Sequence, residues 1–201
     1  MPNSQIFSAP VEVSARHLHL NRRHLNILFG NNSQLTIAKR ISQPGQFAAA
    51  ETVRVIGPRG ELSKVRVVGP LREETQLELA MTDAVRLGIV PKLRTSGNLK
   101  GTTGNVTLVG PKGSVRLRNG VILARRHLHI EPALASQKGL RHLQKVIVET
   151  AGPRKVVFHN VVVRSRAGID KLAFQIDTDE GNAADIRGRQ RAQIIIKGVK
   201  K

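Results

Sequence analysis

The sequence contains no cysteine, no tryptophan and no tyrosine, and only five phenylalanines. The absence of cysteine excludes disulfides, thiolate metal ligands and a cysteine nucleophile, and it fits the reducing cytoplasm in which we expect the protein. No run of about 18 apolar residues is present, so we expect no membrane span. The first ten residues lack a basic start followed by an apolar stretch, and we therefore expect no signal peptide.

Acidic residues are also few. The chain has 14 Asp and Glu against 33 Lys and Arg, which gives a formal net charge of +19. Such an excess indicates a polyanionic partner. Nucleic acid is one candidate, but the basic residues are scattered through strand-like segments and there are few aromatic residues on which bases could stack. A phosphate-rich cofactor such as coenzyme A, together with inorganic phosphate, would also favour a positive field, so charge alone does not choose between them.

The most informative motif is a repeated histidine pair. Arg-His-Leu-His-Leu at 16–20 returns as Arg-His-Leu-His-Ile at 126–130, and the two copies use four of the seven histidines. The apolar residues before each copy indicate a strand, in which side chains at i and i+2 point to the same face. Two imidazoles on one face can bind one metal ion, with Zn–N distances of about 2.0–2.1 Å. The repeat therefore predicts a duplicated, metal-dependent enzyme in which each copy carries half a metal site.

The remaining chain is rich in short strand-like segments separated by Gly-Pro turns, for example at 57–58 and 110–111. Short helices are predicted after each histidine pair, beginning near Asn21 and Pro132. This pattern predicts a mainly β fold with two similar β-barrel domains, capped by short helices and related by internal duplication.

We place the first barrel-like half at 11–105 and the second at 106–197, and the division allows strands to be exchanged between the halves. The polar segment 91–104 is expected to be a loop-like crossing. The end of the chain, 197–201, is expected to be a frayed basic tail.

Third ligands are suggested by the strands after each histidine pair. Glu78 is the best candidate in the first half, beside His17 and His19, and Gln175 occupies the parallel position in the second. A carboxylate added to two imidazoles leaves an open coordination position, which is typical of a catalytic zinc site. His127 and His129 would hold a second ion or complete a shared centre. The alternative is that an exposed His-x-His is only a polar strand face, but its repetition favours metal binding.

Four arginines lie beside the histidine pairs or the turns: Arg16, Arg72, Arg94 and Arg126. A guanidinium binds phosphate through a planar, two-pronged geometry. Arg72 is the strongest phosphate-binding candidate, because it precedes Glu78 closely enough to serve the same pocket.

Other polar residues are given simpler roles. We expect the three remaining histidines to be surface residues: His24, His142 and His159. An acidic cluster could bind a metal, but a helix N-terminus attracts the same residue types, and we favour helix capping for its members: Asp177, Asp179 and Glu180.

With these residues in view, the chain resembles the phosphate propanoyltransferase family, the phosphotransacylases of propanediol utilisation and related bacterial microcompartments. The resemblance covers most of the chain, from about residue 11 to about residue 184. It rests on these blocks: VSARHLHL (13–20), SQPGQF (42–47), GPLREETQLE (69–78), TDAVRLGI (82–89), RTSG (94–97), ARRHLHI (124–130) and IDTDEGNA (176–183).

The resemblance implies a dimer of chains with two β-barrel domains each and a two-metal site between the domains. It implies transfer of an acyl group, propanoyl or similarly short, from coenzyme A to inorganic phosphate, which gives an acyl phosphate and free coenzyme A. It also implies a cytoplasmic location or one within a bacterial microcompartment, with shell or cargo proteins as further partners.

By position, the resemblance implies these site residues: His17, His19 and Glu78 on one zinc ion, His127 and His129 on another, and Arg72 on phosphate. One departure matters, because the family's second ion takes a further histidine where this chain has Gln175. An amide oxygen is a poorer zinc ligand than an imidazole, so we expect a weak or water-completed second site. A lesser departure is Gly181, where the family usually has alanine.

Two other functions stay open. One is a catalytically impaired structural relative in a microcompartment, for which one bound metal ion per chain would argue. The other is a basic, β-rich nucleic-acid-binding protein, which would bind generic DNA or RNA with a steep salt dependence. Saturation by coenzyme A would favour the enzyme.

Overall fold

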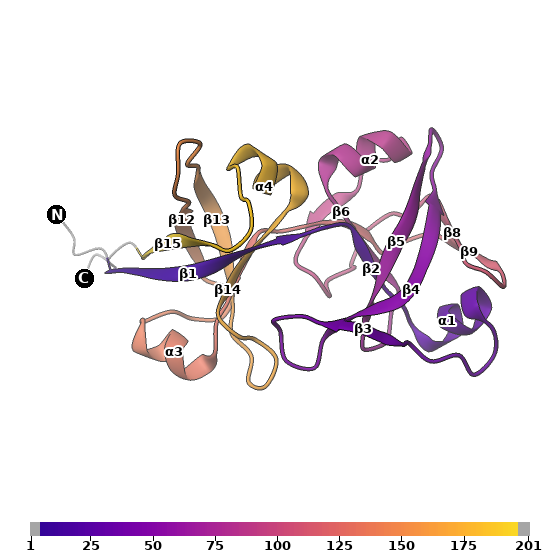
Figure 1. Ribbon diagram of the computed structural model, residues 1–201, viewed down its shortest axis with the longest axis horizontal. Helices are drawn as coiled ribbons and strands as arrows, with labels where there is room; N and C mark the ends of the chain where they lie inside the picture. The colour runs from indigo at the N-terminus through magenta and orange to yellow at the C-terminus, as the bar shows by residue number, and fades with distance from the viewer. Residues whose placement is uncertain (1–4, 197–201) are drawn as a thin grey trace. The chain divides into compact units, whose positions relative to one another are not determined.

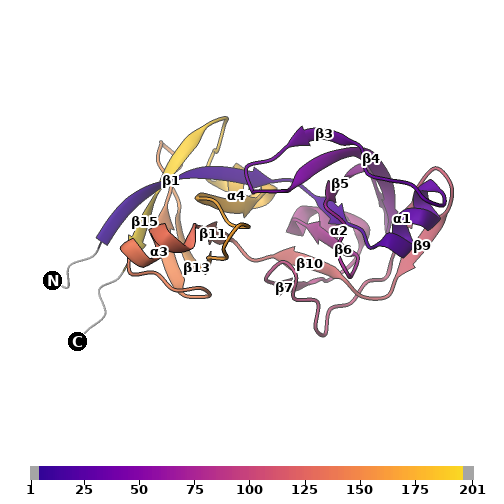
Figure 2. The same ribbon diagram turned by 90° about the horizontal axis from the view of Figure 1, so that it is seen from below.

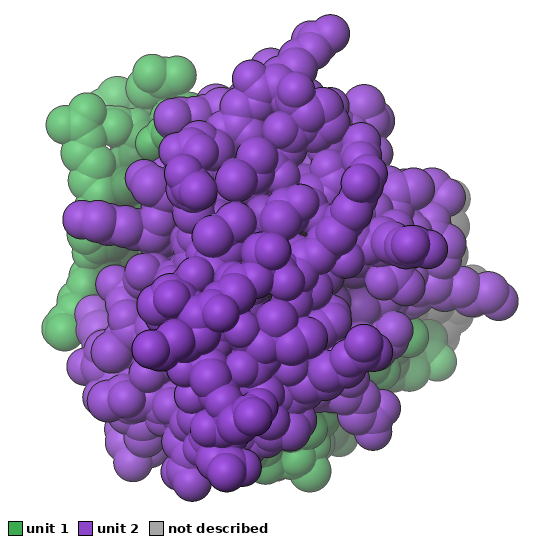
Figure 3. Space-filling view, turned by 90° about the vertical axis from the view of Figure 1, so that its right-hand side faces the viewer, with its two compact units in different colours: residues 1–14, 42–44, 125–201 green, residues 15–41, 45–124 purple. Residues whose placement is uncertain are grey.

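The computed structural model describes residues 5–196, and they form a mainly β structure with four short helices among them, as the sequence predicts (Figure 1). These residues divide into two compact units, coloured green and purple in Figure 3. We call them the barrel unit (the described parts of 1–14, 42–44 and 125–201) and the sheet unit (15–41 and 45–124). None of the helices in the described part of the chain is long and apolar enough to cross a membrane.

The barrel unit is a closed barrel of six strands. Their order is β1 (Gln5–Ser14), β14 (Ala173–Asp177), β11 (His127–His129), β13 (Val157–Arg164), β12 (Lys145–Glu149) and β15 (Gln190–Ile196). Alternating apolar residues turn inward and pack together, among them Leu128, Phe174 and Ile194, each 0% exposed. Helices α3 (Pro132–Gln137) and α4 (Thr178–Ala183) lie on opposite sides of the strands in Figure 1.

The sheet unit contains a nine-stranded sheet. The order is β7 (Lys92–Arg94), β10 (Val121–Ala124), β6 (Gln76–Leu79), β2 (His17–His19), β5 (Glu61–Gly69), β4 (Phe47–Ile56), β8 (Val106–Val109) and β9 (Ser114–Leu117), with β3 (Ile37–Arg40) also paired to β4 (Figure 2). Helices α1 (Arg22–Phe29) and α2 (Met81–Leu87) complete the unit. Leu18, Leu77 and Leu108, each 0% exposed, lie in its core.

The duplication is visible in the strand order. The path β1-β14-β11-β13-β12-β15 has the same parallel and antiparallel pairings as β10-β6-β2-β5-β4-β8. In the barrel unit β15 also pairs with β1 and closes the ring. In the sheet unit β9 pairs with the edge of β8 that faces away from β4, and β7 pairs with the edge of β10 that faces away from β6. Because these added strands occupy the outer edges of β8 and β10, β8 and β10 do not pair with each other. The second sheet therefore keeps the barrel's strand order without closing into a ring.

Strand membership crosses between the two sequence repeats. Strand β1 leads into the first histidine pair but forms its ladders in the barrel unit, whereas β10 leads into the second pair but belongs to the sheet unit. Residues 106–124 thus belong to the sheet unit by their pairing, although the sequence division places them in the second half. Hydrophobic alternation shows that a segment is a strand, but not which sheet it joins. The end of the predicted second half, residue 197, lies outside the described residues, as does the predicted frayed tail.

The segment 91–104 is not entirely a loop. It contains β7, which pairs in parallel with β10 through Lys92, Leu93 and Arg94. Three residues are too few for alternation to predict a strand, so the expectation of a strandless crossing is wrong here.

Two Gly-Pro turns donate hydrogen bonds to the carboxyl ends of the helices in the sheet unit, α1 and α2. The Arg59 N–H donates to the Leu87 carbonyl at 3.1 Å, and the Lys112 N–H donates to the Leu28 carbonyl at 3.0 Å. Each turn thereby satisfies a carbonyl that the end of a helix leaves without an intrahelical donor. The approach requires glycine, because a Cβ on Gly57 would lie 2.3 Å from the Leu87 oxygen.

Candidate metal centre

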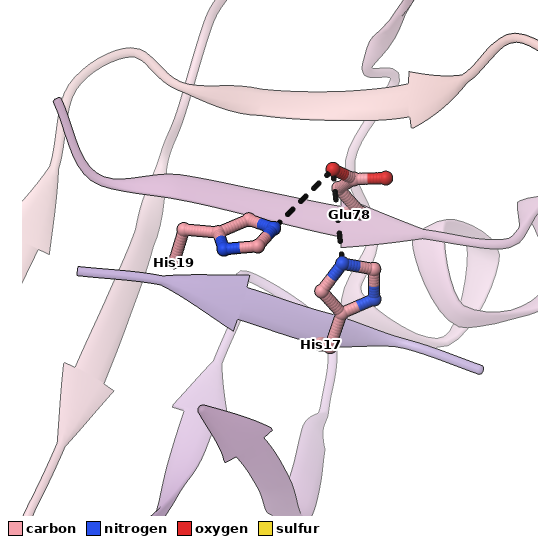
Figure 4. A group of neighbouring side chains, drawn as sticks. All are labelled: His17, His19 and Glu78. Atoms are coloured by element: carbon pink, nitrogen blue, oxygen red, sulfur yellow. Dashed lines mark ion pairs between the residues drawn. The ribbon is translucent and has the colours of Figure 1, made fainter. Parts of the chain in front are cut away.

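The first histidine pair lies on β2, between β5 and β6. His17 is directly opposite Glu78 on antiparallel β6, and His19 is opposite Gln76. Directly opposed residues project from the same face, and the i, i+2 spacing places both imidazoles on it. Leu18 points to the other face and into the core, which anchors the strand. Figure 4 shows the two rings and the Glu78 carboxylate turned toward one another.

The distances in this cluster suit a metal ion. His17 Nε2 and His19 Nε2 lie 3.7 and 3.8 Å from Glu78 Oε1, and the three ligand atoms lie within 4.8 Å of one another (Figure 4). Two ligands of a tetrahedral zinc ion, each about 2.0–2.1 Å from it, would be roughly 3.3 Å apart. The cluster therefore needs only a small contraction, and its two nitrogens and one oxygen are the donor set of a catalytic zinc site.

The backbone fixes the form of both imidazoles. The Nδ1 atoms lie 2.9 Å from main-chain oxygens, those of Ala15 for His17 and Val68 for His19. A carbonyl oxygen only accepts, which assigns the proton to Nδ1 and leaves the lone pair on Nε2, toward Glu78. Burial, and then the charges of His17 and Arg72, hold the pKa of His19 well below its ordinary value. His19 is therefore neutral at pH 7, as a metal ligand must be.

Glu78 is ionised in this environment. Burial alone would raise the pKa of its carboxyl, but the neighbouring imidazoles of His17 and His19, the hydrogen bond from Ser96 and the Arg72 guanidinium together hold it well below its ordinary value. The carboxylate oxygen Oε1 accepts from the Ser96 hydroxyl at 2.6 Å, and it also accepts a short bond from the Gln76 amide. A buried carboxylate held in this way supplies a fixed negative charge to the cluster.

Arg72 is linked to the cluster through one hydroxyl group. Its Nη1 donates to Ser96 Oγ at 3.2 Å, and the same hydroxyl donates to Glu78. The Gln76 amide holds the loop, because its Nε2 donates to Ser96 Oγ at 3.0 Å and its Oε1 accepts from the Gly97 N–H at 2.8 Å. Sequence reasoning named Arg72 and Glu78 but missed Ser96 and Gln76. The available signals were the RTSG block and the i, i+2 spacing of Gln76 and Glu78.

The other three candidate arginines have different partners. Arg16 Nη1 donates to Asp83 Oδ1 at 2.6 Å, and Arg126 Nε donates to Glu180 Oε1 at 2.8 Å. Each pair joins the residue before a histidine pair to the first turn of a short helix. Arg94 donates to main-chain carbonyl oxygens of its own loop. These contacts give Arg16, Arg94 and Arg126 structural partners, so Arg72 is the candidate that lies in the cluster's hydrogen-bond network.

The second histidine pair repeats the arrangement on β11. His127 is opposite Gln175, as predicted from the duplication. The two Nε2 atoms of His127 and His129 are 2.9 Å apart, and Gln175 Oε1 is 3.3 Å from His129 Nε2. The Nδ1 of His127 lies 2.8 Å from the Arg125 carbonyl, and that of His129 lies 2.6 Å from Asp170 Oδ1. The Nε2 atoms of the second pair thus face each other, and the Gln175 amide oxygen lies beside that of His129.

The remaining histidines differ in burial. His142 and His159 are exposed, as expected. His24 is half-buried in α1 instead of lying free on the surface, and its Nδ1 is 2.8 Å from Thr75 Oγ1. Burial, and then the charge of Arg23, lower its pKa. The prediction was wrong for His24 because its position on the helix face is set by packing against a distant residue.

Helix capping accounts for two members of the acidic cluster. The Asp177 side chain accepts from the Glu180 N–H at 2.8 Å, and the Glu180 side chain accepts from the Asp177 N–H at 3.2 Å. This reciprocal capping box begins α4, and it confirms the predicted role of these residues.

Comparisons with known proteins show the family to which the chain belongs. The model of the family described as phosphate propanoyltransferase matches residues 10–187. The phosphate propanoyltransferase of Thermotoga maritima is 48% identical over 176 residues, which cover 87% of this chain and 82% of the relative. That of Rhodopseudomonas palustris is 46% identical over 192 residues, covering 95% and 84%, and that of Rhodobacter capsulatus is 48% identical over 174 residues, covering 87% and 80%. The chain therefore belongs to the phosphate propanoyltransferase family, as its motifs predict, and the expectation of an acyltransferase-family enzyme is confirmed.

Proposed function

We propose that this protein is a metal-dependent phosphate acyltransferase. It converts a short-chain acyl-coenzyme A, propanoyl-coenzyme A or a similar thioester, and inorganic phosphate into an acyl phosphate and free coenzyme A. The observation that supports this function most strongly is the link from Arg72 through Ser96 to Glu78, which holds a phosphate-binding side chain beside a metal-ligand cluster.

We propose two zinc ions per chain. His17, His19 and Glu78 would hold one, and His127, His129 and Gln175 would hold the other, more weakly. The donor atoms fit, since Nε2 of His17, His19 and His129 each lies within 4 Å of a side-chain oxygen, and Nε2 of His127 lies 2.9 Å from that of His129. A bound zinc ion supplies a Lewis acid that withdraws electron density from a carbonyl or phosphate oxygen.

The chain's own residues would orient the phosphate. The Arg72 guanidinium offers paired N–H donors to phosphate oxygens, and Ser96 limits its movement. A phosphate oxygen forms a bond to the thioester carbonyl carbon while the carbon–sulfur bond breaks, and the leaving coenzyme A sulfur takes up a proton. Direct attack requires no covalent acyl-enzyme, in agreement with the absence of cysteine.

The net charge of +19 suits both substrates, because each carries phosphate groups. We also propose a homodimer, located in the cytoplasm or within a bacterial microcompartment, as the resemblance implies. A catalytically impaired relative and a nucleic-acid-binding protein are the rival functions.

The test measures coenzyme A release from propanoyl-coenzyme A with added phosphate and zinc. His17→Ala and Arg72→Ala should each lower the rate at least about 100-fold, because one removes a ligand and the other a phosphate anchor. His142→Ala is the matched control, since this exposed histidine lies outside both pairs. Wild-type turnover by either variant would contradict the function, and saturable binding of generic DNA without thioester cleavage would favour the nucleic-acid-binding rival.

A further inference from the structure

A glutamate on a neighbouring strand contacts the residue that departs from the family pattern. Glu12 on β1 is the register partner of Gln175 on β14, and Gln175 Nε2 donates to Glu12 Oε2 at 2.8 Å. The Ser42 hydroxyl donates to the same oxygen at 2.8 Å. All three residues belong to the barrel unit. The Gln175 side chain is thus held in place by Glu12, which does not belong to the histidine pair.

This contact assigns the orientation of the Gln175 amide. A carboxylate only accepts hydrogen bonds, so the NH₂ group of Gln175 must face Glu12. The amide oxygen Oε1 then faces the histidine pair, 3.3 Å from His129 Nε2. With Glu12 in place, Gln175 presents an acceptor to the histidines instead of a donor.

The histidines present acceptors as well. The Nδ1 protons are committed to the Arg125 carbonyl and the Asp170 carboxylate. Asp170 is itself fixed, because Arg166 donates to its two oxygens at 2.8 and 2.9 Å. The Nε2 lone pairs of His127 and His129 therefore face each other at 2.9 Å, with Gln175 Oε1 nearby. The 2.9 Å separation is that of a hydrogen bond, so a shared proton or, in its place, a metal ion must lie between these acceptor atoms.

The sheet unit has an equivalent pair of strands, but its carboxylate lies on the other strand of that pair. There the carboxylate of Glu78 lies opposite the first histidine, and its neighbour on the next strand is Ile122. In the barrel unit the neutral Gln175 lies opposite the first histidine, and its neighbour on the next strand is Glu12. Each unit therefore has one carboxylate in this strand pair. In the barrel unit the Glu12 carboxylate holds the Gln175 amide, and the amide oxygen faces the histidines.

We propose that Glu12 is the positioning residue of the barrel unit's metal site. Its carboxylate holds the amide so that Gln175 Oε1 binds a divalent ion together with His127 and His129, and it offsets part of the ion's charge. The site selects a divalent ion that accepts two nitrogens and a neutral oxygen, such as zinc. The inference deepens the proposed function and rests on its metal dependence, but it is measured by ion binding.

The experiment titrates the full chain, freed of metal by a chelator, with Zn²⁺ by calorimetry. Wild type should bind two ions, one more weakly than the other. Glu12→Gln should leave the strong site unchanged and weaken the other about 10-fold or more, because an amide at position 12 can also donate and no longer fixes Gln175. The double variant Glu12→Ile with Gln175→Glu, which copies the sheet unit, should restore or exceed wild-type affinity.

Glu149→Gln is the matched control, a glutamate of the barrel unit whose partner is Lys155. It should bind both ions as wild type does, and thermal unfolding verifies that each variant is folded.

Unchanged affinity of both sites in Glu12→Gln would overturn the proposal, as would a double variant no better than the single one. A wild-type chain that binds one ion, with a proton shared by His127 and His129, would overturn it as well. Acyl transfer by a wild-type chain that binds only one ion would refute this inference but not the function, whereas two bound ions that respond to Glu12→Gln as expected, without acyl transfer, would do the reverse.

Discussion

Ser96 is a small residue with three hydrogen-bonding partners in the candidate site. Its hydroxyl donates to Glu78 and accepts from Arg72 and Gln76. The hydroxyl therefore fixes the distance between Arg72, which we propose to bind phosphate, and the cluster.

We predict that Ser96→Ala raises KM for phosphate about 10-fold, because a hydrogen bond to a charged group contributes about 1.5–3 kcal/mol. KM for the thioester should change little. Initial rates at varied phosphate and fixed propanoyl-coenzyme A measure the effect, and Ser114→Ala, an exposed serine on β9, is the control. An unchanged KM for phosphate would mean that Ser96 does not position Arg72.

Asp170 is the most buried charged partner of either histidine pair. Its side chain is 0% exposed, and it lies between His129 Nδ1 and the Arg166 guanidinium. Although burial raises the pKa of this carboxyl, the hydrogen bonds from Arg166 and His129 hold it well below its ordinary value. The carboxylate is therefore charged and bound on both sides.

Asp170→Asn should lower the free energy of unfolding by about 2–3 kcal/mol at pH 7, since it weakens two charged hydrogen bonds in a buried place. Urea denaturation measures this loss. The control is Asp185→Asn, whose partner Arg187 is largely exposed and which should cost less than about 1 kcal/mol. Equal losses in the two variants would contradict the structural role of Asp170.

The sequence predicts those site residues that lie close together along the chain or that repeat between its two halves, such as Glu78 and Gln175. His17 and His19 are two positions apart on a strand, so their common face follows from spacing alone. Glu12, Ser96 and Asp170 reach the histidine pairs through strand pairing and loop placement. No local pattern distinguishes Glu12 and Asp170 from other polar residues, so these two could not be predicted, whereas the RTSG block was an available signal for Ser96.

At the element scale, the short helices owe their ends to local and to distant groups. Asn21 caps α1 by accepting from the His24 N–H at 2.8 Å, as the sequence predicts. The donors at the carboxyl ends of α1 and α2 come instead from the Gly-Pro turns. Sequence reasoning found these turns as chain reversals, but their contacts with helices depend on packing.

Gly57→Ala should therefore destabilise the protein by more than about 2 kcal/mol, because the new methyl group would meet the Leu87 carbonyl oxygen. Gly152→Ala is an informative control, since φ is +94° there but no atom lies within 4 Å of an added Cβ. It should cost only about 1–2 kcal/mol, from backbone strain. Thermal or urea unfolding compares the two variants, and a loss in Gly57→Ala no larger than that in Gly152→Ala would contradict the role given to the contact with Leu87.

Gly181 also has a structural reason at this scale. A Cβ at this position in α4 would lie 2.7 Å from the nearer γ-methyl of Val13 on β1. Strand β1, from the other end of the chain, thus occupies the space that a Cβ at position 181 would need.

At the scale of the whole molecule, the chain is a duplication whose copies share strands. Composition and the repeated histidine motif predict the mainly β class and the duplication, because both depend on local patterns. The exchange of β1 and β10 does not follow from those patterns, since each strand precedes one histidine pair and pairs with strands of the other unit. Only long-range pairing energy decides between such topologies.

We propose that the paired imidazoles hold ions that acyl transfer to phosphate requires. The most direct measurement is coenzyme A release from propanoyl-coenzyme A by the wild-type chain, before and after dialysis against a chelator and again after zinc is restored. We predict release that depends on phosphate, falls to background in the dialysed protein and returns with zinc. An unchanged rate in the metal-free protein, or release that does not depend on phosphate, would contradict the account.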